Sequence, residues 1–131
     1  EKLRDATIFE AQSFTSILLE NQGDGSFTSK ALPDYAQWSP INAIAPVGDD
    51  HYLLAGNFLH SNIEMGWYEA NYGQILSFDQ NQEMSISSLG DVRLKGEVRA
   101  VKPILVNGQS CFLVAINDGP LKLLKMEKVL Q

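Results

Sequence analysis

Apolar and polar positions alternate in short runs along most of the chain, and clusters of Gly, Asn and Asp separate these runs. Runs rich in Ile, Val, Phe and Tyr that are bounded in this way are typical of β-strands joined by turns. Asn107-Gly108 lies between two such runs and is the clearest signal for a two-residue hairpin. We therefore expect strands over residues 13–21, 26–32, 41–47, 51–57, 73–79, 84–89, 98–106, 110–117 and 121–128.

A helical pattern is confined to residues 1–12. Leu3, Ala6, Ile8 and Phe9 can form an apolar stripe on a helix there. A segment this short is marginal as a helix in water unless it packs against something. We expect a short N-terminal helix or arm.

Several segments of the chain resemble one another at a nearly constant spacing. The matching segments are residues 41–46 with 98–103 at an offset of 57, residues 53–57 with 113–117 at 60, residues 17–18 with 75–76 at 58, and Phe27 and Leu32 with Met84 and Leu89 at 57. One repeat is therefore about four strands long. A four-stranded antiparallel unit that recurs every 40–60 residues or so is typical of a β-propeller blade.

The repeat predicts an all-β fold made of antiparallel four-stranded, propeller-type blades. We expect one domain over residues 1–131, with an arm (1–12), a partial unit (13–32), a full unit (41–89) and a second unit (98–128). About two blades form an incomplete ring, because a closed propeller usually has at least four. The flanks would then expose apolar surface, so we expect self-association or packing on the remainder of a longer propeller.

Composition and charge narrow the classes of partner. The chain has 131 residues, 44% of them hydrophobic, and a formal net charge of −6. An acidic chain binds a phosphate backbone poorly, which argues against nucleic acid. No apolar run approaches the roughly 20 residues of a membrane helix, which argues against membrane insertion. The single cysteine, Cys111, rules out an intrachain disulfide, and its apolar neighbours predict a buried thiol.

Short segments along most of the chain occur in the order found in one propeller family. Residues 21–27 resemble its Asn-x-Gly-Asp-Gly-x-Phe hairpin, and residues 36–42 its Ala-Gln-Phe-Ser-Pro-Val/Ile-Asn segment. Residues 53–58 resemble its Leu-Leu-Ala-Gly-Asn-Phe strand, and residues 64–73 its Glu-x-Gly-Arg-Tyr-Asp-Ala-x-x-Gly loop. The family is that of FG-GAP/VCBS-repeat β-propellers. The likeness is closest to the C-terminal part of bacterial members related to the ASPIC/UnbV and cartilage-acidic-protein group.

This resemblance implies a secreted, periplasmic or cell-surface protein that binds a ligand and has no enzymatic activity. Many members of the family bind calcium through an Asp-x-Asp-x-Asp-Gly loop. The matching loop here, residues 47–51, is shorter and has two aspartates, and the loop at 106–109 has no carboxylate. Calcium needs six to eight oxygen ligands. We therefore expect no cofactor and no metal, although calcium is the ion that the family would favour.

The connection over residues 58–73 is the best candidate for a binding site. It is about 16 residues long where most connections are short, and long loops often carry function. Its aromatic residues lie beside amides and carboxylates, a combination that suits a sugar or a peptide. The same aromatics could instead seal the contact between blades. The candidate ligand-binding residues are Trp38, Asn57, Glu64, Trp67, Tyr68 and Tyr72.

No pattern of histidines, carboxylates or nucleophiles predicts a catalytic residue. His60 and Glu64 have a spacing that suits a metal only on a helix, and Asn62 argues against a helix there. We expect a non-enzymatic binding module for a protein or glycan ligand. The alternatives are a purely structural end-of-propeller domain, and a carbohydrate-active enzyme that uses Glu64 and Glu69 with Trp67.

Overall fold

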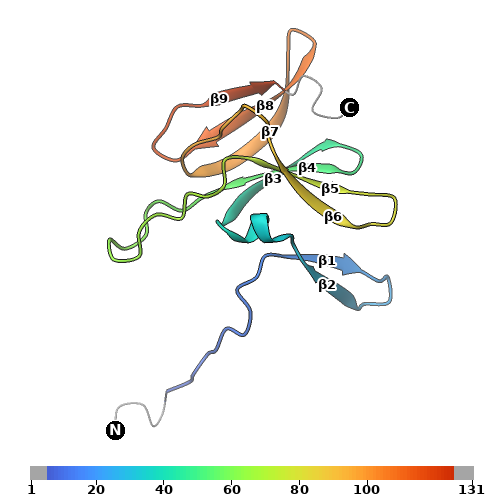
Figure 1. Cartoon of the computed structure of the whole chain (residues 1–131), viewed down its shortest axis with the longest axis vertical. Coiled ribbons are helices and arrows are strands. Elements are labelled where there is room, and N and C mark those ends of the chain that lie inside the picture. Colours follow the sequence, from blue (N-terminus) through green and yellow to red (C-terminus); the bar gives the residue numbers. More distant parts are fainter. Residues whose placement is uncertain (1–5, 126–131) are drawn as a thin grey trace.

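The chain forms three antiparallel β-sheets of two, four and three strands, arranged one after another in the computed structural model (Figure 1). The structure describes residues 6–125, and within them no closed ring of strands is present. Each strand pairs with its neighbour in sequence within its sheet. The strands are β1 (Ile17–Asn21), β2 (Phe27–Ala31), β3 (Ile41–Gly48), β4 (His51–Gly56), β5 (Gln74–Phe78), β6 (Met84–Ser88), β7 (Val98–Val106), β8 (Gln109–Ile116) and β9 (Lys122–Lys125).

The all-β prediction is confirmed, and each predicted strand is present within a few residues of its expected bounds. The last one is seen as Lys122–Lys125, and the predicted residues 126–128 lie outside the described part. A short 3₁₀ helix, η1 (Asp34–Gln37), lies in a segment for which we expected no regular structure. Asn107 and Gly108 both have positive φ, as the predicted two-residue hairpin turn requires.

The predicted N-terminal helix is wrong for the residues that can be described. Residues 6–16 contain neither helix nor strand, and residues 1–5 of the predicted helix lie outside the described part. Ile8 and Phe9 are almost fully exposed, so the apolar stripe has no surface to pack on. Without that packing a helix this short does not repay the cost of its nucleation.

The repeat is present in the pairing of the strands. Ala43 faces Ala55 in the β3–β4 hairpin, and Ala100 faces Ala115 in the β7–β8 hairpin, which reproduces the offsets of 57 and 60. Both hairpins also have a register shift directly before that pair. The two hairpins therefore share one backbone design, including its irregularity.

The β1–β2 hairpin repeats the β5–β6 hairpin at an offset of 57 throughout. Ile17 faces Ala31 as Gln74 faces Ser88, so the offset of 58 expected for β1 is wrong by one residue. The register follows the connecting turns, which have equal length. With the offset of 57, Leu18 takes the place of Ile75, and each packs toward the sheet that follows its own.

Two cores lie on the two faces of the four-stranded sheet. One core joins this sheet to β7–β9, and the other joins it to β1, to Leu32 directly after β2, and to η1. Leu53 belongs to the first core and its neighbour Leu54 to the second. This double burial explains why β4 is apolar at successive positions instead of alternating.

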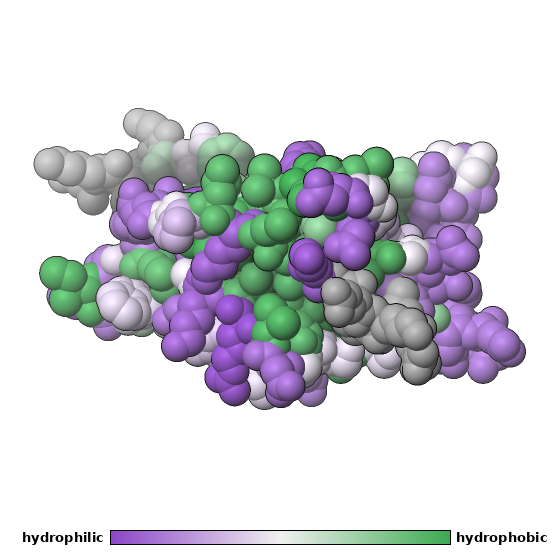
Figure 2. All heavy atoms as spheres, turned by 90° about the horizontal axis from the view of Figure 1, so that it is seen from above, coloured by the Kyte–Doolittle hydropathy of each residue, from purple (hydrophilic) through white to green (hydrophobic). Residues whose placement is uncertain are grey.

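The outer face of the three-stranded sheet lacks such a cover among the described residues. Figure 2 views the molecule from the side of this sheet and shows apolar side chains gathered there between polar ones. Leu123 in β9 and Leu121 directly before it are exposed. The stack of sheets therefore presents apolar surface at its end.

Replacing Gly56 with Ala should destabilise the fold by about 2–3 kcal/mol. A Cβ at this position would overlap the carbonyl oxygen of Pro40, which is backbone and cannot turn away. Urea unfolding followed by tryptophan fluorescence measures the change. Gly119→Ala is the control, because its Cβ would meet the Ile116 side chain at 3.1 Å and the nearest backbone atom, the Asn117 carbonyl oxygen, at an ordinary contact distance of 3.7 Å. Equal losses in the two variants would contradict the steric explanation.

Candidate functional site

The long connection between β4 and β5 forms an arm, defined here as residues 58–72, that extends away from the sheets (Figure 1). Comparison with the equivalent connection in the next repeat gives the extra length of the arm. His51 faces Ser77 in the first full sheet, and Cys111 faces Lys125 in the next, so the offset is 60 before the connection and 48 after it. The arm is therefore an insertion of 12 residues relative to the turn between β8 and β9.

Polar groups of the arm are used to fold the arm itself. Phe58 and Tyr68 exchange two backbone hydrogen bonds of 3.0 Å, which form the stem. At the tip, the backbone N–H of Glu64 donates to Oδ1 of Asn62 at 2.7 Å, and the hydroxyl of Ser61 donates to a backbone carbonyl. The arm is a self-contained hairpin-like loop.

The tip of the arm presents large apolar side chains to solvent. Ile63 is 100% exposed and Trp67 is 74% exposed, and Met65 between them is also exposed. Single exposed apolar residues are ordinary, but a group of three on one projecting loop is typical of an interaction site. Trp67 is the most exposed of the aromatic residues predicted for the site.

Asn57 fixes the base of the arm. Its side chain is fully buried; its Oδ1 accepts from the Ser39 hydroxyl at 2.8 Å and from the backbone N–H of Asn71 at 2.9 Å. Its Nδ2 donates to the carbonyl oxygens of Asn71 at 2.7 Å and Gly96 at 3.0 Å. Every polar atom of this side chain is engaged, so Asn57 positions the arm and offers no group to a ligand.

A second set of polar contacts ties the arm to the residue before β7 and to the turn after β8. Nδ1 of His60 lies 2.8 Å from Oε2 of Glu97, and its Nε2 lies 3.3 Å from Oδ2 of Asp118. The Glu97 side chain is only 1% exposed and also contacts Arg99 at 2.6 Å. Burial acts to raise the pKa of Glu97, but hydrogen bonds from His60 and Asn117 and the charge of Arg99 outweigh it and lower the pKa.

Sequence reasoning missed this cluster. His60 and Glu97 are 37 residues apart, and no short motif joins them. The only available signal was a difference between repeats, because Glu97 occupies the place that Pro40 has one repeat earlier. A charged residue that replaces an apolar one at a strand entrance indicates a partner from elsewhere in the fold.

An open groove of about 680 Å³ lies between the arm and the turn that joins β8 to β9. Trp67 and Glu69 line it from the arm, and Asn117 and Pro120 from the turn. Oε1 of Glu69 accepts a hydrogen bond of 3.4 Å from the backbone N–H of Gly96 at its base. The groove thus joins an exposed tryptophan to a polar floor.

The other predicted site residues lie outside this groove. Trp38 is exposed beyond η1 and packs edge-on against Tyr35, with ring centroids 4.9 Å apart. Tyr72 is half-buried under the Arg93 guanidinium, 5.5 Å from the ring centroid. Glu64 lies at the tip of the arm, and Tyr68 in its stem. The predicted residues therefore do not form a single binding surface.

Residues 6–125 contain no group of three or more His, Cys, Asp or Glu side chains placed to hold a metal ion. None of their helices is long and apolar enough to cross a membrane. Asp49 and Asp50 form a two-residue turn between Gly48 and His51. Among known proteins, no family model, no curated protein and no solved structure matches this chain.

Replacing Glu97 with Gln should destabilise the protein at neutral pH, and the difference from the wild type should shrink on acidification. The pKa of Glu97 is lowered in the folded state, so its contribution is complete above the pKa of an unfolded glutamate, about 4.3. That contribution is lost as the pH falls through the lower folded value. Urea unfolding of both proteins across this pH range measures the difference.

Glu83→Gln serves as the matched control, because Glu83 is exposed and its carboxylate makes no hydrogen bond or ion pair within residues 6–125. The control variant should be destabilised only slightly, and by an amount that does not shrink on acidification. A destabilisation by Glu97→Gln that increases on acidification would contradict the assignment.

Proposed function

We propose that the protein is a non-enzymatic binding module built from propeller-type blades, whose arm presents an apolar tip to a protein ligand. The observation that carries this proposal is the exposure of Ile63, Met65 and Trp67 on one projecting loop. Tryptophan and methionine are enriched in protein interfaces, and tryptophan often supplies much of the binding energy.

The propeller-type architecture is supported by the repeat and by the packing between repeats. The β3–β4 and β7–β8 hairpins have the same register, and the first strands of the two units, β3 and β7, lie against each other. This arrangement is expected for successive blades around an axis. Secretion or display at the cell surface is part of the proposal and rests on the resemblance to FG-GAP/VCBS-repeat proteins.

A protein ligand is favoured over a glycan because the amides of the arm are already engaged. A sugar site needs polar groups beside its aromatic platform. Oδ1 of Asn62 is bonded to the Glu64 backbone, and Asn57 and Asn71 are buried. The tip therefore offers mainly apolar contacts, which suit a protein surface.

A glycosidase is disfavoured by the positions of its two proposed carboxylates. Hydrolysis of a glycosidic bond generally needs a pair of carboxylates on either side of one bond. Glu64 is at the tip of the arm, whereas Glu69 lines the groove and accepts a bond from Gly96. Glu64 does not line the groove that contains Glu69.

A purely structural role is the second candidate, and the base of the arm favours it. Asn57 and His60 each contact residues of the next unit, so this part of the arm seals the junction between sheets. These contacts involve the base and leave the tip free. We therefore assign the structural role to the base and the binding role to the tip.

A variant with Ile63, Met65 and Trp67 all changed to Ser should lose at least tenfold in affinity for protein ligands, with little loss of stability, because these side chains are exposed. The measurement selects peptides from a phage-displayed random library against the wild-type protein and determines their affinities by calorimetry. A variant with Phe27 and Leu105 changed to Ser is the matched control, since these exposed residues lie in β2 and β7 and line no part of the groove beside the arm.

Two results would contradict the proposal. One is a set of selected peptides that bind the arm variant as tightly as the wild type. The other is specific binding on a glycan array, or turnover of chromogenic glycosides, that is lost in Glu64→Gln and Glu69→Gln. The first would remove the binding role from the tip, and the second would favour the carbohydrate-active alternative.

A further inference from the structure

Two equivalent positions in the repeat differ sharply in exposure. Val101 of β7 corresponds to Ile44 of β3 at the offset of 57. Val101 is 5% exposed, because it packs in the core between the four-stranded and three-stranded sheets. Ile44 is 63% exposed. The surface around Ile44 therefore lacks the cover that its counterpart receives.

The face around Ile44 lacks two strands that cover the equivalent face around Val101. The face of β7 that contains Val101 is covered by the preceding sheet, which consists of the β3–β4 hairpin and then β5–β6. In front of β3, the described chain has only β1–β2, which matches β5–β6, and residues 6–16 form no strand. Nothing among the described residues takes the place of a first and second strand there.

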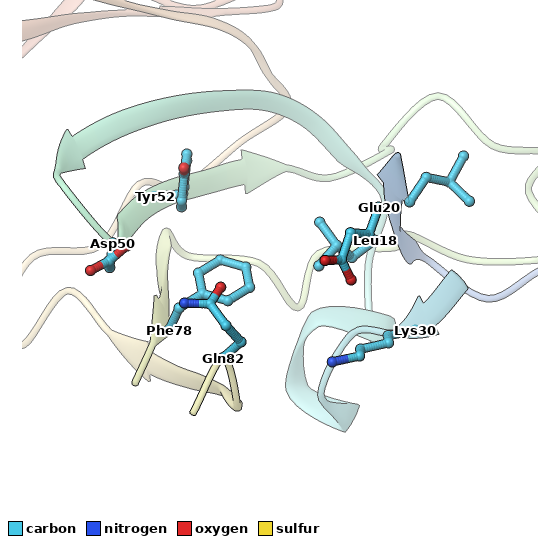
Figure 3. A pocket seen from close by; sticks show the side chains of 8 residues that line it. Leu18, Glu20, Lys30, Asp50, Tyr52, Phe78 and Gln82 are labelled. Carbon is cyan, nitrogen blue, oxygen red and sulfur yellow. The ribbon is translucent and has the colours of Figure 1, made fainter. Parts of the chain in front are cut away.

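An apolar cleft of about 270 Å³ occupies this place. It lies between the β1–β2 hairpin and the face of the four-stranded sheet, and it is lined by Ile17, Leu18, Leu32, Ile44, Tyr52, Leu54, Leu76 and Phe78. The cleft continues into a second pocket with a polar end, where Tyr52 and Phe78 lie on one side and Leu18 on the other (Figure 3).

The edge of β1 that borders the cleft is open in the described part. In the other two sheets the equivalent edge is paired, because β4 pairs with β5 and β8 pairs with β9. Transferring the β4–β5 register by the offset of 57 places a second strand opposite Ile17, Leu18, Leu19 and Glu20. An unpaired strand edge is a template for another strand.

We propose that this cleft binds an apolar β-hairpin of a partner polypeptide, one strand of which pairs antiparallel with β1 while the other covers Ile44. Addition of a strand to an open edge is a common mode of peptide recognition, in which backbone bonds give affinity and side-chain pockets give specificity. The chemistry of the hairpin follows from β3–β4, which covers the equivalent face of β7–β8 and combines branched apolar residues with alanine. This inference rests on the repeat and does not depend on the arm.

A second copy of the chain is a poorer occupant. The occupant needs a second strand whose outer edge is free to pair with β1. In the described chain, the outer edge of β4 is taken by β5 and that of β8 by β9. A second copy would first have to break one of these pairings, whereas a separate hairpin would not.

A synthetic peptide with the sequence of residues 41–56 is the probe, because these residues form the hairpin that covers β7–β8. We expect it to bind the full chain, and we expect at least a tenfold loss of affinity in Ile44→Glu, measured by calorimetry. Ile44 is exposed, so this variant should fold. Leu105→Glu is the control, because Leu105 is an exposed residue of β7 that does not line the cleft, and it should bind like the wild type.

Hydrogen exchange supplies a second readout that is specific for strand pairing. Bound peptide should slow exchange at residues 17–20, and a peptide of scrambled sequence should not. Absence of binding, or binding unchanged by Ile44→Glu, would overturn the proposal. Self-association of the chain that is lost in Ile44→Glu, without peptide binding, would assign the cleft to a second copy. The Ser variant of the arm should bind the probe normally, so the two proposals can fail separately.

Discussion

The arrangement of the molecule depends on the burial of β4 on both faces. Leu53 and Leu54 are neighbours in this strand, and both are almost completely buried. Successive side chains of a strand point to opposite faces, so each of these residues needs its own apolar layer. The β7–β9 sheet covers one face, and β1, η1 and Leu32 between β2 and η1 cover the other. A single sheet with one solvated face could not bury this sequence.

The same requirement explains which surfaces are left over. In a stack of sheets, the faces between neighbouring sheets are buried. The faces at the two ends have no neighbouring sheet to cover their apolar side chains. At one end this surface lies around Ile44, and at the other around Leu123. Both ends have a counterpart inside the stack that is buried, namely Val101 for Ile44 and Ile75 for Leu123. The side chains that bury Val101 and Ile75 between the sheets therefore indicate what kind of surface would cover each end.

The arm adds a polar junction to this apolar stack. A buried carboxylate is costly unless it is paired, and Glu97 is paired with His60 from the arm and Arg99 from the adjoining strand β7. The amide of Asn57 meets the same demand for hydrogen bonds at the base of the arm. Because both groups cross between sheets, the position of the arm is coupled to the packing of the sheets. The rigid base then holds an exposed tip in one direction.

Local information in the sequence determined the strands, the hairpin turns and the repeat, because alternation and turn chemistry act over a few residues. It also located the arm by its length, and Trp67 within it. The N-terminal helix failed because its stripe found no packing surface, which is a tertiary condition. Only the tertiary structure showed that Asn57 is buried in the junction and that His60 meets Glu97. Those roles depend on contacts between residues distant in sequence, and such contacts leave no local pattern.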